Sequence, residues 1–323
     1  MDYEEYGYDD NDNRDYYRRR NGDVLTFKYD ALNRMVEKSV PENPGVDASH
    51  TRDVCYRYNN AGLMTATLFD SYPGNASQCA GEGITQNYNV LGHMKYSTIN
   101  LDSVSRTLTY THNDNGFRVN VTHPDGQPFS YVPDNLSRLT RITHSSANTL
   151  ASYGYKAEGY LDNLSGGVTT RYGYDGIGRI DSLAHDLGGS SYDNTYGYSY
   201  IPSSQISQLT TSNTAYAPIA SQQNKTYVAN GLNQYTDVSG AIHRYDDNGN
   251  LIDDGQTVYT FDQENRLVKA AVKNGGALKA ELWYDPLGRL YKVQGPSATT
   301  QFLYDGDELV AEFNNTSTTV QQR

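Results

Sequence analysis

Hydrophobic and polar residues alternate over short stretches of this chain. In one such stretch Leu25, Phe27 and Tyr29 alternate with Thr26 and Lys28. This is the period of two expected of a β-strand with one buried face. No segment combines helical spacing with capping residues. The pattern therefore predicts an all-β chain.

The alternation belongs to an internal repeat that reads aromatic-x-Tyr-Asp-x-x-Gly-Arg-Leu, with its sharpest copies at 174–180 and 284–290. Eight copies keep the register, and counted from the aromatic residue their +4 position is always glycine or asparagine. The eight copies begin at Tyr29, Tyr58, Tyr88, Tyr155, Tyr174, Tyr245, Phe261 and Tyr284. Their +4 residues are Asn33, Gly62, Gly92, Gly159, Gly178, Gly249, Asn265 and Gly288. Weaker copies extend the series to Tyr304, and the mean period is about 23 residues.

The residue types found at the fixed positions of the repeat have a physical explanation. The aspartate that follows the tyrosine can accept hydrogen bonds from amides two residues further on, which opens a type I turn. The +4 residue must then adopt a left-handed backbone conformation, which glycine adopts freely and asparagine tolerates next best. Each unit is therefore predicted to be a β-hairpin. A dozen such units would make a sheet about 115 Å across, too wide to stay flat, so it should curl into a spiral or an incomplete tube.

Two segments depart from the repeat. Residues 1–22 are dense in Asp, Glu, Asn and Tyr, and we expect them to form an acidic, tyrosine-rich, disordered tail. Residues 23–323 form the repeat region, and the Ser-, Thr- and Gly-rich interval 188–226 is expected to be a loop-rich insertion within it.

The composition limits the classes of partner. The chain has 30 tyrosines among 323 residues and a net charge of -12. A negative surface argues against binding to nucleic acid or to anionic lipid, since both require positive charge. No apolar run is long enough to span a membrane, and the start of the sequence lacks the features of a secretion signal. We therefore expect a cytoplasmic location before export. The many tyrosines, whose rings can bury an apolar face while the hydroxyl stays in water, predict a thin, aromatic core.

Motifs for chemistry are missing from the sequence. The seven histidines show no metal-ligand spacing, and no nucleophile elbow, phosphate-binding loop or dinucleotide fingerprint occurs. The recurring carboxylates are explained as turn formers. We predict no catalytic, cofactor-binding or metal-binding residue and a protein that is not an enzyme. The two cysteines, Cys55 and Cys79, could form a disulfide or remain free thiols.

The repeat resembles the YD-repeat, or RHS (rearrangement hot spot), family. The likeness rests on the copies at 29–34, 174–179 and 284–289 and on the run from 231 to 267, and it extends over residues 24–323. It implies an array of about a dozen YD-repeat β-hairpins that curls into a spiral, partial cocoon-like shell. In bacterial members the shell encloses a toxin, in insecticidal toxin complexes or in polymorphic effectors. In animal teneurins a similar shell mediates adhesion.

The end of the sequence differs from the bacterial members. Such proteins continue past a segment like 304–313 into a core with paired Asp-Pro-x-Gly motifs, which acts as an aspartate autoprotease. The one such motif here, 285–288, fits an ordinary turn. We therefore expect a shell segment truncated before the core autoprotease and toxin.

The resemblance gives two expectations for function. The first is a structural segment of an RHS-type shell that encloses or presents another polypeptide in a secreted or cell-surface system, exported by a route that needs no signal peptide. Its partners would be the remaining shell segments or the encapsulated toxin polypeptide. The alternative is a surface repeat protein whose exposed tyrosines bind a carbohydrate or a receptor.

Overall fold

The computed structural model describes residues 3–70, 81–144, 148–216, 224–315, 317 and 320–322. The chain divides into two compact units: unit 1 consists of residues 1–108 and 224–323, and unit 2 consists of residues 109–223. Within the described residues the regular structure is 30 β-strands and two 3₁₀ turns. The strands pair antiparallel, mostly with the next strand in the sequence, so the predicted all-β hairpin array is confirmed.

Unit 1 contains a first sheet in which each strand pairs with the next. Its strands are β1 (Glu5–Tyr8), β2 (Arg14–Arg18), β3 (Val24–Tyr29), β4 (Met35–Ser39), β5 (Val54–Tyr58), β6 (Met64–Phe69), β7 (Gly83–Tyr88), β8 (Met94–Leu101) and β9 (Val104–His112). The 3₁₀ turn η1 (Ala48–His50) lies between β4 and β5. Strand β9 runs across the boundary between the two units.

Two further sheets complete unit 1. The small sheet comprises β19 (Tyr227–Ala229), β20 (Tyr235–Val238) and β21 (Ala241–Ile242). The large second sheet has nine strands in sequence order. These are β22 (Arg244–Tyr245), β23 (Leu251–Asp253), β24 (Thr257–Phe261), β25 (Leu267–Val272), β26 (Leu278–Tyr284), β27 (Leu290–Gln294), β28 (Thr299–Asp305), β29 (Glu308–Asn314) and β30 (Val320–Gln322).

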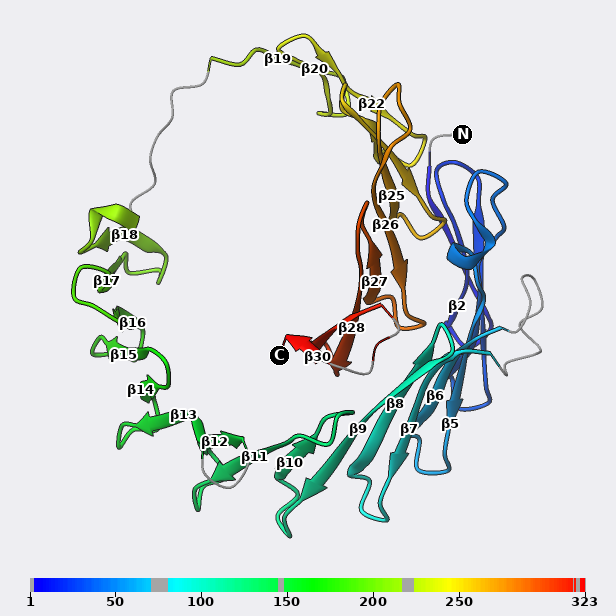
Figure 1. The fold of residues 1–323 in the computed structure, drawn as a ribbon. Helices are drawn as coiled ribbons and strands as arrows, with labels where there is room; N and C mark the ends of the chain where they lie inside the picture. The colour runs from blue at the N-terminus through cyan, green and yellow to red at the C-terminus, as the bar shows by residue number, and fades with distance from the viewer. Residues whose placement is uncertain are drawn as a thin grey trace. The chain divides into compact units, whose positions relative to one another are not determined.

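The core of unit 1 lies between its two large sheets, which Figure 1 shows with the brown and red strands beside the blue and cyan ones. Strand β3 alternates as the sequence predicts, with Leu25 and Phe27 buried between exposed neighbours. Further buried side chains of the first sheet are Val54, Ile84, Ile99 and Leu108. Those of the second sheet are Val268, Ala270, Tyr291, Leu303, Ala311 and Phe313. Burial of these apolar faces is the main favourable contribution to the stability of the unit.

Polar contacts fix how the two sheets of unit 1 meet. The buried Arg106 donates to Oε1 of Gln301 at 2.7 Å, and its guanidinium lies 4.1 Å from the ring centre of Phe313. Nζ of Lys292 lies 2.8 Å from Oδ2 of Asp102. Because a buried charge without a partner is costly, these pairs favour one alignment of the two sheets over others.

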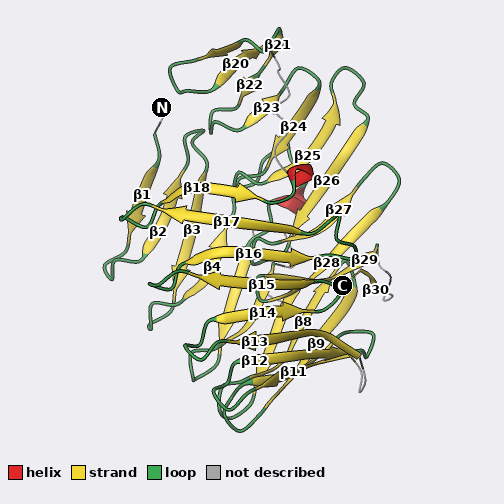
Figure 2. Ribbon diagram, turned by 90° about the vertical axis from the view of Figure 1, so that its left-hand side faces the viewer, coloured by secondary structure: helices red, strands yellow, loops and turns green. Residues whose placement is uncertain are grey.

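Unit 2 is a single sheet, in which the end of β9 pairs with β10 and each strand then pairs with the next. Its strands are β10 (Arg118–Thr122), β11 (Pro128–Pro133), β12 (Leu139–His144), β13 (Asn148–Tyr155), β14 (Leu161–Ser165), β15 (Thr169–Tyr174), β16 (Ile180–Asp186), β17 (Asn194–Tyr200) and β18 (Ile206–Thr211), followed by the 3₁₀ turn η2 (Thr214–Tyr216). Figure 2 shows β11 to β18 stacked as one layer of strands.

The N-terminal segment differs from the expectation of disorder. Strands β1 and β2 pair over residues 5–18, and the rings of Tyr6 and Tyr17 stack with centres 4.8 Å apart. Asp9 accepts hydrogen bonds from the amide and the side chain of Asn13, as in the repeat turns. The segment is therefore one more hairpin, because its tyrosines and turn residues outweigh the effect of its charge.

The interval 188–226 is more regular than a loop-rich insertion. It contains β17 and β18, whose registered pairing runs from Tyr196 opposite Thr211 to Tyr200 opposite Ile206. Residues 217–223 of this interval lie outside the described residues. Serine and threonine are compatible with strands when their side chains lie on a polar face, which explains the difference.

Asp70 is a buried carboxylate at the end of β6. Its side chain is fully buried, and in the described part of the chain neither of its carboxylate oxygens accepts a hydrogen bond. Nε of Arg52 is 3.9 Å away. Burial, with a smaller contribution from the charge of Asp53, raises the pKa of Asp70 to about 6.

We expect Asp70→Asn to stabilise the protein at pH 7.5 by about 2 to 3 kcal/mol, because the variant buries no charge. The folded pKa is raised above the ordinary value of 3.8, so the stability that Asp70 contributes is fully present below about pH 4 and is lost as the pH rises from there to about 6. Urea unfolding of both proteins at several pH values measures the difference. A difference that stays constant from pH 4 to pH 7.5 would contradict the assignment.

Candidate functional site

Fifteen turns in the described residues share one hydrogen-bond pattern, here numbered from the last residue of the incoming strand. The amide of +1 donates to the carbonyl of +5, and the amide of +4 donates to the carbonyl of +1, as in Asp30 to Arg34 and Asn33 to Asp30, both at 2.9 Å. The +1 residues are Asp9, Arg19, Asp30, Asn59, Asn89, Asn113, His123, Asp134, Lys156, Asp175, Ile201, Asn230, Asp246, Asp262 and Asp285. All fifteen turns therefore share one backbone geometry, although the residues that form them differ.

The eight +4 residues taken from the sequence all lie in the left-handed region, with φ between 59° and 94°. Sequence reasoning misses the turns that contain Asp12, Gly22 and Gly126, which have φ values of 63°, 96° and 81°. A Tyr-Asp pair at residues 8 and 9 marks the first of them. The other two follow Arg19 and His123 and carry no such pair.

Where the +1 residue is aspartate or asparagine, its side chain accepts hydrogen bonds that stabilise the turn. Oδ1 of Asp175 accepts from the amides of Ile177 and Arg179, each at 3.0 Å. Oδ1 of Asn59 makes the same two contacts with the amides of Ala61 and Leu63. The amide of Arg179 is the largest cause that lowers the pKa of Asp175 below its usual value.

The +5 arginine joins one hairpin to the next. Where +1 is aspartate and +5 is arginine, the two side chains form an ion pair at 2.6 to 2.7 Å, and the guanidinium lies over the ring of the following tyrosine. The distances from guanidinium carbon to ring centre are 4.6 Å for Arg34 and Tyr58, 4.5 Å for Arg138 and Tyr155, 4.4 Å for Arg179 and Tyr200, 4.8 Å for Arg266 and Tyr284, and 4.9 Å for Arg289 and Tyr304. Each such contact adds about 0.5 to 2 kcal/mol.

The tyrosine hydroxyls make a second link between hairpins. Each donates to the carbonyl of the +6 residue of the preceding unit, at 2.6 to 3.1 Å. The pairs are Tyr29 to Arg14, Tyr58 to Met35, Tyr88 to Met64, Tyr155 to Leu139, Tyr174 to Leu161, Tyr200 to Ile180, Tyr245 to Tyr235, Tyr284 to Leu267 and Tyr304 to Leu290. Burial raises the pKa of Tyr58, Tyr88 and Tyr284, so these hydroxyls stay protonated donors. The repeat residues thus form a ladder that couples neighbouring hairpins.

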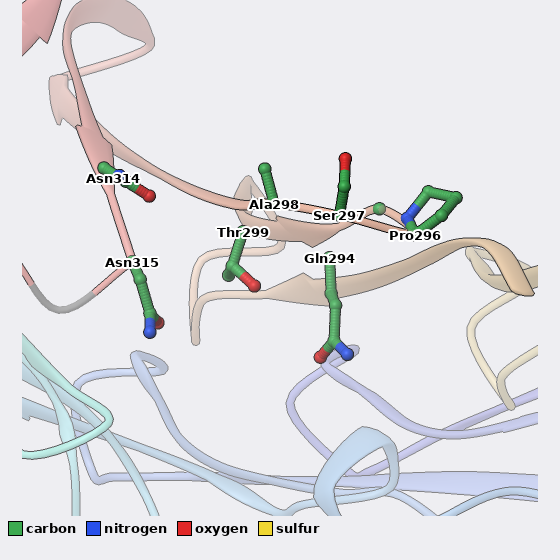
Figure 3. Close-up of a pocket in the computed structure, with 8 residues that line it drawn as sticks. Gln294, Pro296, Ser297, Ala298, Thr299, Asn314 and Asn315 are labelled. Atoms are coloured by element: carbon green, nitrogen blue, oxygen red, sulfur yellow. The ribbon is translucent and has the colours of Figure 1, made fainter.

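Two shallow depressions lie in unit 1. One, of about 340 Å³, is formed by the β27–β28 turn and the end of β29, and Figure 3 shows Gln294, Thr299 and Asn315 directed to the same side of it. The other, of about 420 Å³, lies on the first sheet and includes Arg57 and Thr98. Across the residues given in the structure, no three His, Cys, Asp or Glu side chains come together as metal ligands. No helix in the same residues is long and apolar enough to cross a membrane.

Cys55 lies in β5 and is buried, with 2% of its surface exposed. Its expected partner, Cys79, lies outside the described residues. The disulfide between them stays a prediction.

Comparison with known proteins finds short sequence matches. No family model matches the chain. The tRNA nuclease WapA of Bacillus subtilis strain 168 and the tRNA(Glu)-specific nuclease WapA of Bacillus subtilis subsp. natto are each 35% identical over 80 residues. Each match covers 25% of this chain and 3% of the relative. The chain thus spans a small part of the length of these curated relatives.

Comparison with solved structures finds the same fold over almost the whole chain. The complex TcdB2-TccC3-TEV matches with a TM-score of 0.51 and 13% identity, over 98% of this chain and 20% of that one. A Tc holotoxin pore of Photorhabdus luminescens matches with a TM-score of 0.50 and 12% identity, over 98% and 19%. Identity this low shows the fold alone. The chain has the fold of an RHS-type β-hairpin array.

Gly159 provides a test of the turn, because it has φ +94 and an added Cβ would meet nothing within 4 Å. We expect Gly159→Val to destabilise the protein by more than about 1 kcal/mol, since a β-branched residue is strained in this conformation. Gly159→Asn is the matched control, because asparagine holds the same position at Asn33 and Asn265, and it should cost less. Equal melting temperatures for wild type and Gly159→Val would refute the requirement for a left-handed conformation at this position of the turn.

Asp175 separates the two functions of the +1 side chain. Asp175→Asn keeps the acceptor for the turn amides but loses the ion pair with Arg179, whereas Asp175→Ala loses both. We expect the melting temperature at pH 7 to fall in both variants, roughly twice as far for Ala as for Asn. The pKa of Asp175 is lowered in the folded state, so the deficit of the Asn variant should shrink as the pH falls through that lowered value. Scanning calorimetry checks the order, and an Asn variant as unstable as the Ala variant would count against it.

Proposed function

We propose that this chain is a non-enzymatic segment of a YD-repeat, RHS-type β-hairpin shell that encloses or presents another polypeptide, such as a toxin, in a secreted or cell-surface system. The observation that carries the proposal is an aromatic and aliphatic face on the single sheet of unit 2. The likeness in fold to Tc toxin complexes supports it.

Strand pairing places these apolar side chains on one face of the sheet, since directly opposed residues share a face. The residues are Phe129, Tyr131, Ile142, Tyr153, Leu164, Tyr172, Leu183, Tyr196, Tyr198 and Leu209. The opposite face is mostly polar, with Ser130, Arg141, Ser152, Asn163, Arg171, Ser182, Thr195 and Gln208. The sheet thus has a water-facing side and a side suited to contact with apolar groups.

Unit 1 supplies the comparison. There the corresponding face of the first sheet is covered by the second sheet, and Leu25, Ile84 and Leu108 are 3%, 3% and 0% exposed. The apolar face of unit 2 keeps its side chains half-buried, or exposed in the case of Leu209. Contiguous apolar surface of this kind is typical of an interaction site, and tyrosine offers both a ring face and a hydroxyl to the partner. A polypeptide with exposed apolar side chains is the partner that fits.

The test is binding of a permanently unfolded polypeptide, reduced and carboxymethylated α-lactalbumin, measured by fluorescence anisotropy. We expect the wild type to bind, and the triple variant Tyr153→Ser, Tyr172→Ser and Tyr196→Ser to bind at least about tenfold more weakly. The matched control is Tyr192→Ser, which removes a tyrosine that is 61% exposed in a loop outside this face. Circular dichroism confirms that each variant is folded.

Two results would overturn the proposal. One is the absence of polypeptide binding by the wild type. The other is binding to a glycan array that is lost in the triple variant while the polypeptide does not bind, which would favour the carbohydrate- or receptor-binding alternative.

A further inference from the structure

Strand β18 is the free edge of the unit 2 sheet and the last strand of the layer in Figure 2. One side of β18 pairs with β17, and its other side pairs with no strand in the described residues. A row of unpaired backbone groups is a template on which another extended chain can pair. The outer edge of β18 is therefore a candidate interaction surface that lies within one unit.

The hydrogen-bond register shows which backbone groups of β18 face outward. The amide of Ser212 donates to the carbonyl of Thr195 at 3.0 Å, so these residues form a hydrogen-bonded pair just beyond the strand. Along an antiparallel ladder such pairs alternate with non-hydrogen-bonded pairs, whose amides and carbonyls point away from the partner strand. Counting back from Ser212, Thr211 and Leu209 belong to non-hydrogen-bonded pairs. Their amides and carbonyls are therefore the ones directed outward.

Strand β18 lacks the charged residues and prolines that usually protect a free edge from pairing. It is six residues long, and no Asp, Glu, Lys or Arg occurs between residues 194 and 224. Its register shift lies next to the turn, as in the other hairpins, and does not distinguish this edge. Ile206 and Leu209 are each 58% exposed. In a chain that is 20% charged, this neutral and exposed strand is an edge left open to pairing.

The side-chain link that joins other hairpins is missing at this edge. In that link a tyrosine hydroxyl takes the +6 carbonyl of the preceding unit, and the +5 arginine of that unit lies over the tyrosine ring. At the β17–β18 turn the +5 residue is Gln205, and the next turn in the sequence has Ala229 in the place of the tyrosine. The sequence thus supplies neither side chain of the usual link for this edge.

We propose that the outer edge of β18 binds an extended segment of the enclosed or presented polypeptide as an added β-strand, an inference that rests on the proposed function. Main-chain hydrogen bonds to Leu209 and Thr211 would supply the affinity, and side chains the preference. Leu209 lies on the apolar face of unit 2, directly opposite Tyr198. A valine, isoleucine or aromatic residue beside Leu209 would continue that face. The segment that fits is therefore uncharged, with apolar residues at alternate positions.

Fluorescence anisotropy with a labelled peptide tests the added strand. The probe is an acetylated and amidated peptide of about ten residues in which valine alternates with threonine. The control peptide has the same sequence with every backbone nitrogen methylated. We expect the wild type to bind the probe, and to bind the methylated peptide at least about tenfold more weakly, because methylation removes the donors that pair with β18.

A pair of variants tests the outward amide of Leu209. Leu209→Pro removes this amide and leaves the pairing with β17 in place, because proline is tolerated where the N–H of an edge strand faces solvent. The matched variant is Leu209→Val, since valine is close to proline in size and keeps the amide. The proline variant should bind the probe at least about tenfold more weakly than the valine variant.

Hydrogen exchange measured by nuclear magnetic resonance locates the added strand in the wild type, without any substitution. With saturating probe, the amides of Leu209 and Thr211 should exchange at least about tenfold more slowly. The amides of Gln208 and Thr210 already face β17 and should change much less. This measurement decides the matter even if Leu209→Pro does not fold.

Equal binding of the probe and the methylated peptide overturns the added strand. So does probe binding that leaves the exchange of Leu209 and Thr211 unchanged. Neither result touches the proposed function if the wild type still binds unfolded α-lactalbumin. A wild type that binds the probe but no α-lactalbumin gives the converse result, which overturns the proposed function and retains the β18 edge as a peptide site.

Discussion

The structure depends on one local constraint, the return of the chain at +4 in a left-handed conformation. Gly178 and Asn33 meet it with different side chains, and Asp or Asn at +1 stabilises the turn by accepting the amides of +3 and +5. Both requirements are satisfied within five residues. The same hairpin can therefore recur along the chain with strands of very different sequence.

Neighbouring hairpins are then coupled by two side chains. The tyrosine hydroxyl reaches the +6 carbonyl of the preceding unit, and the +5 arginine joins its own aspartate to the next tyrosine ring, as Arg266 does for Tyr284. These links act along the array, from one hairpin to the next. The links thus stabilise the pairing of neighbouring hairpins, but they do not by themselves bury the apolar face of the sheet.

The two units differ in how they treat that face. In unit 1 a second sheet covers it, and Arg106, Gln301 and Phe313 close the interface. In unit 2 a single layer presents Tyr153, Tyr172 and their neighbours on one side. In unit 1 the apolar face of the first sheet packs against the apolar and aromatic side chains of another sheet, so this face of the repeat can bind an apolar polypeptide surface. The proposed role in enclosing or presenting a polypeptide follows from this difference.

The sequence by itself determined the strand alternation, the hairpin turns and the residues able to take positive φ, because these are properties of five to ten consecutive residues. It did not reveal the hairpin at residues 5–18, where dense charge obscured the Tyr8–Asp9 pair, nor the carbonyls that accept the tyrosine hydroxyls. Only the tertiary structure decided which sheet covers which. Arg106 and Gln301 are 195 residues apart. Since every repeat has a similar sequence, the local pattern cannot specify which sheet packs on which. The burial of apolar and charged side chains that are far apart in the sequence specifies it.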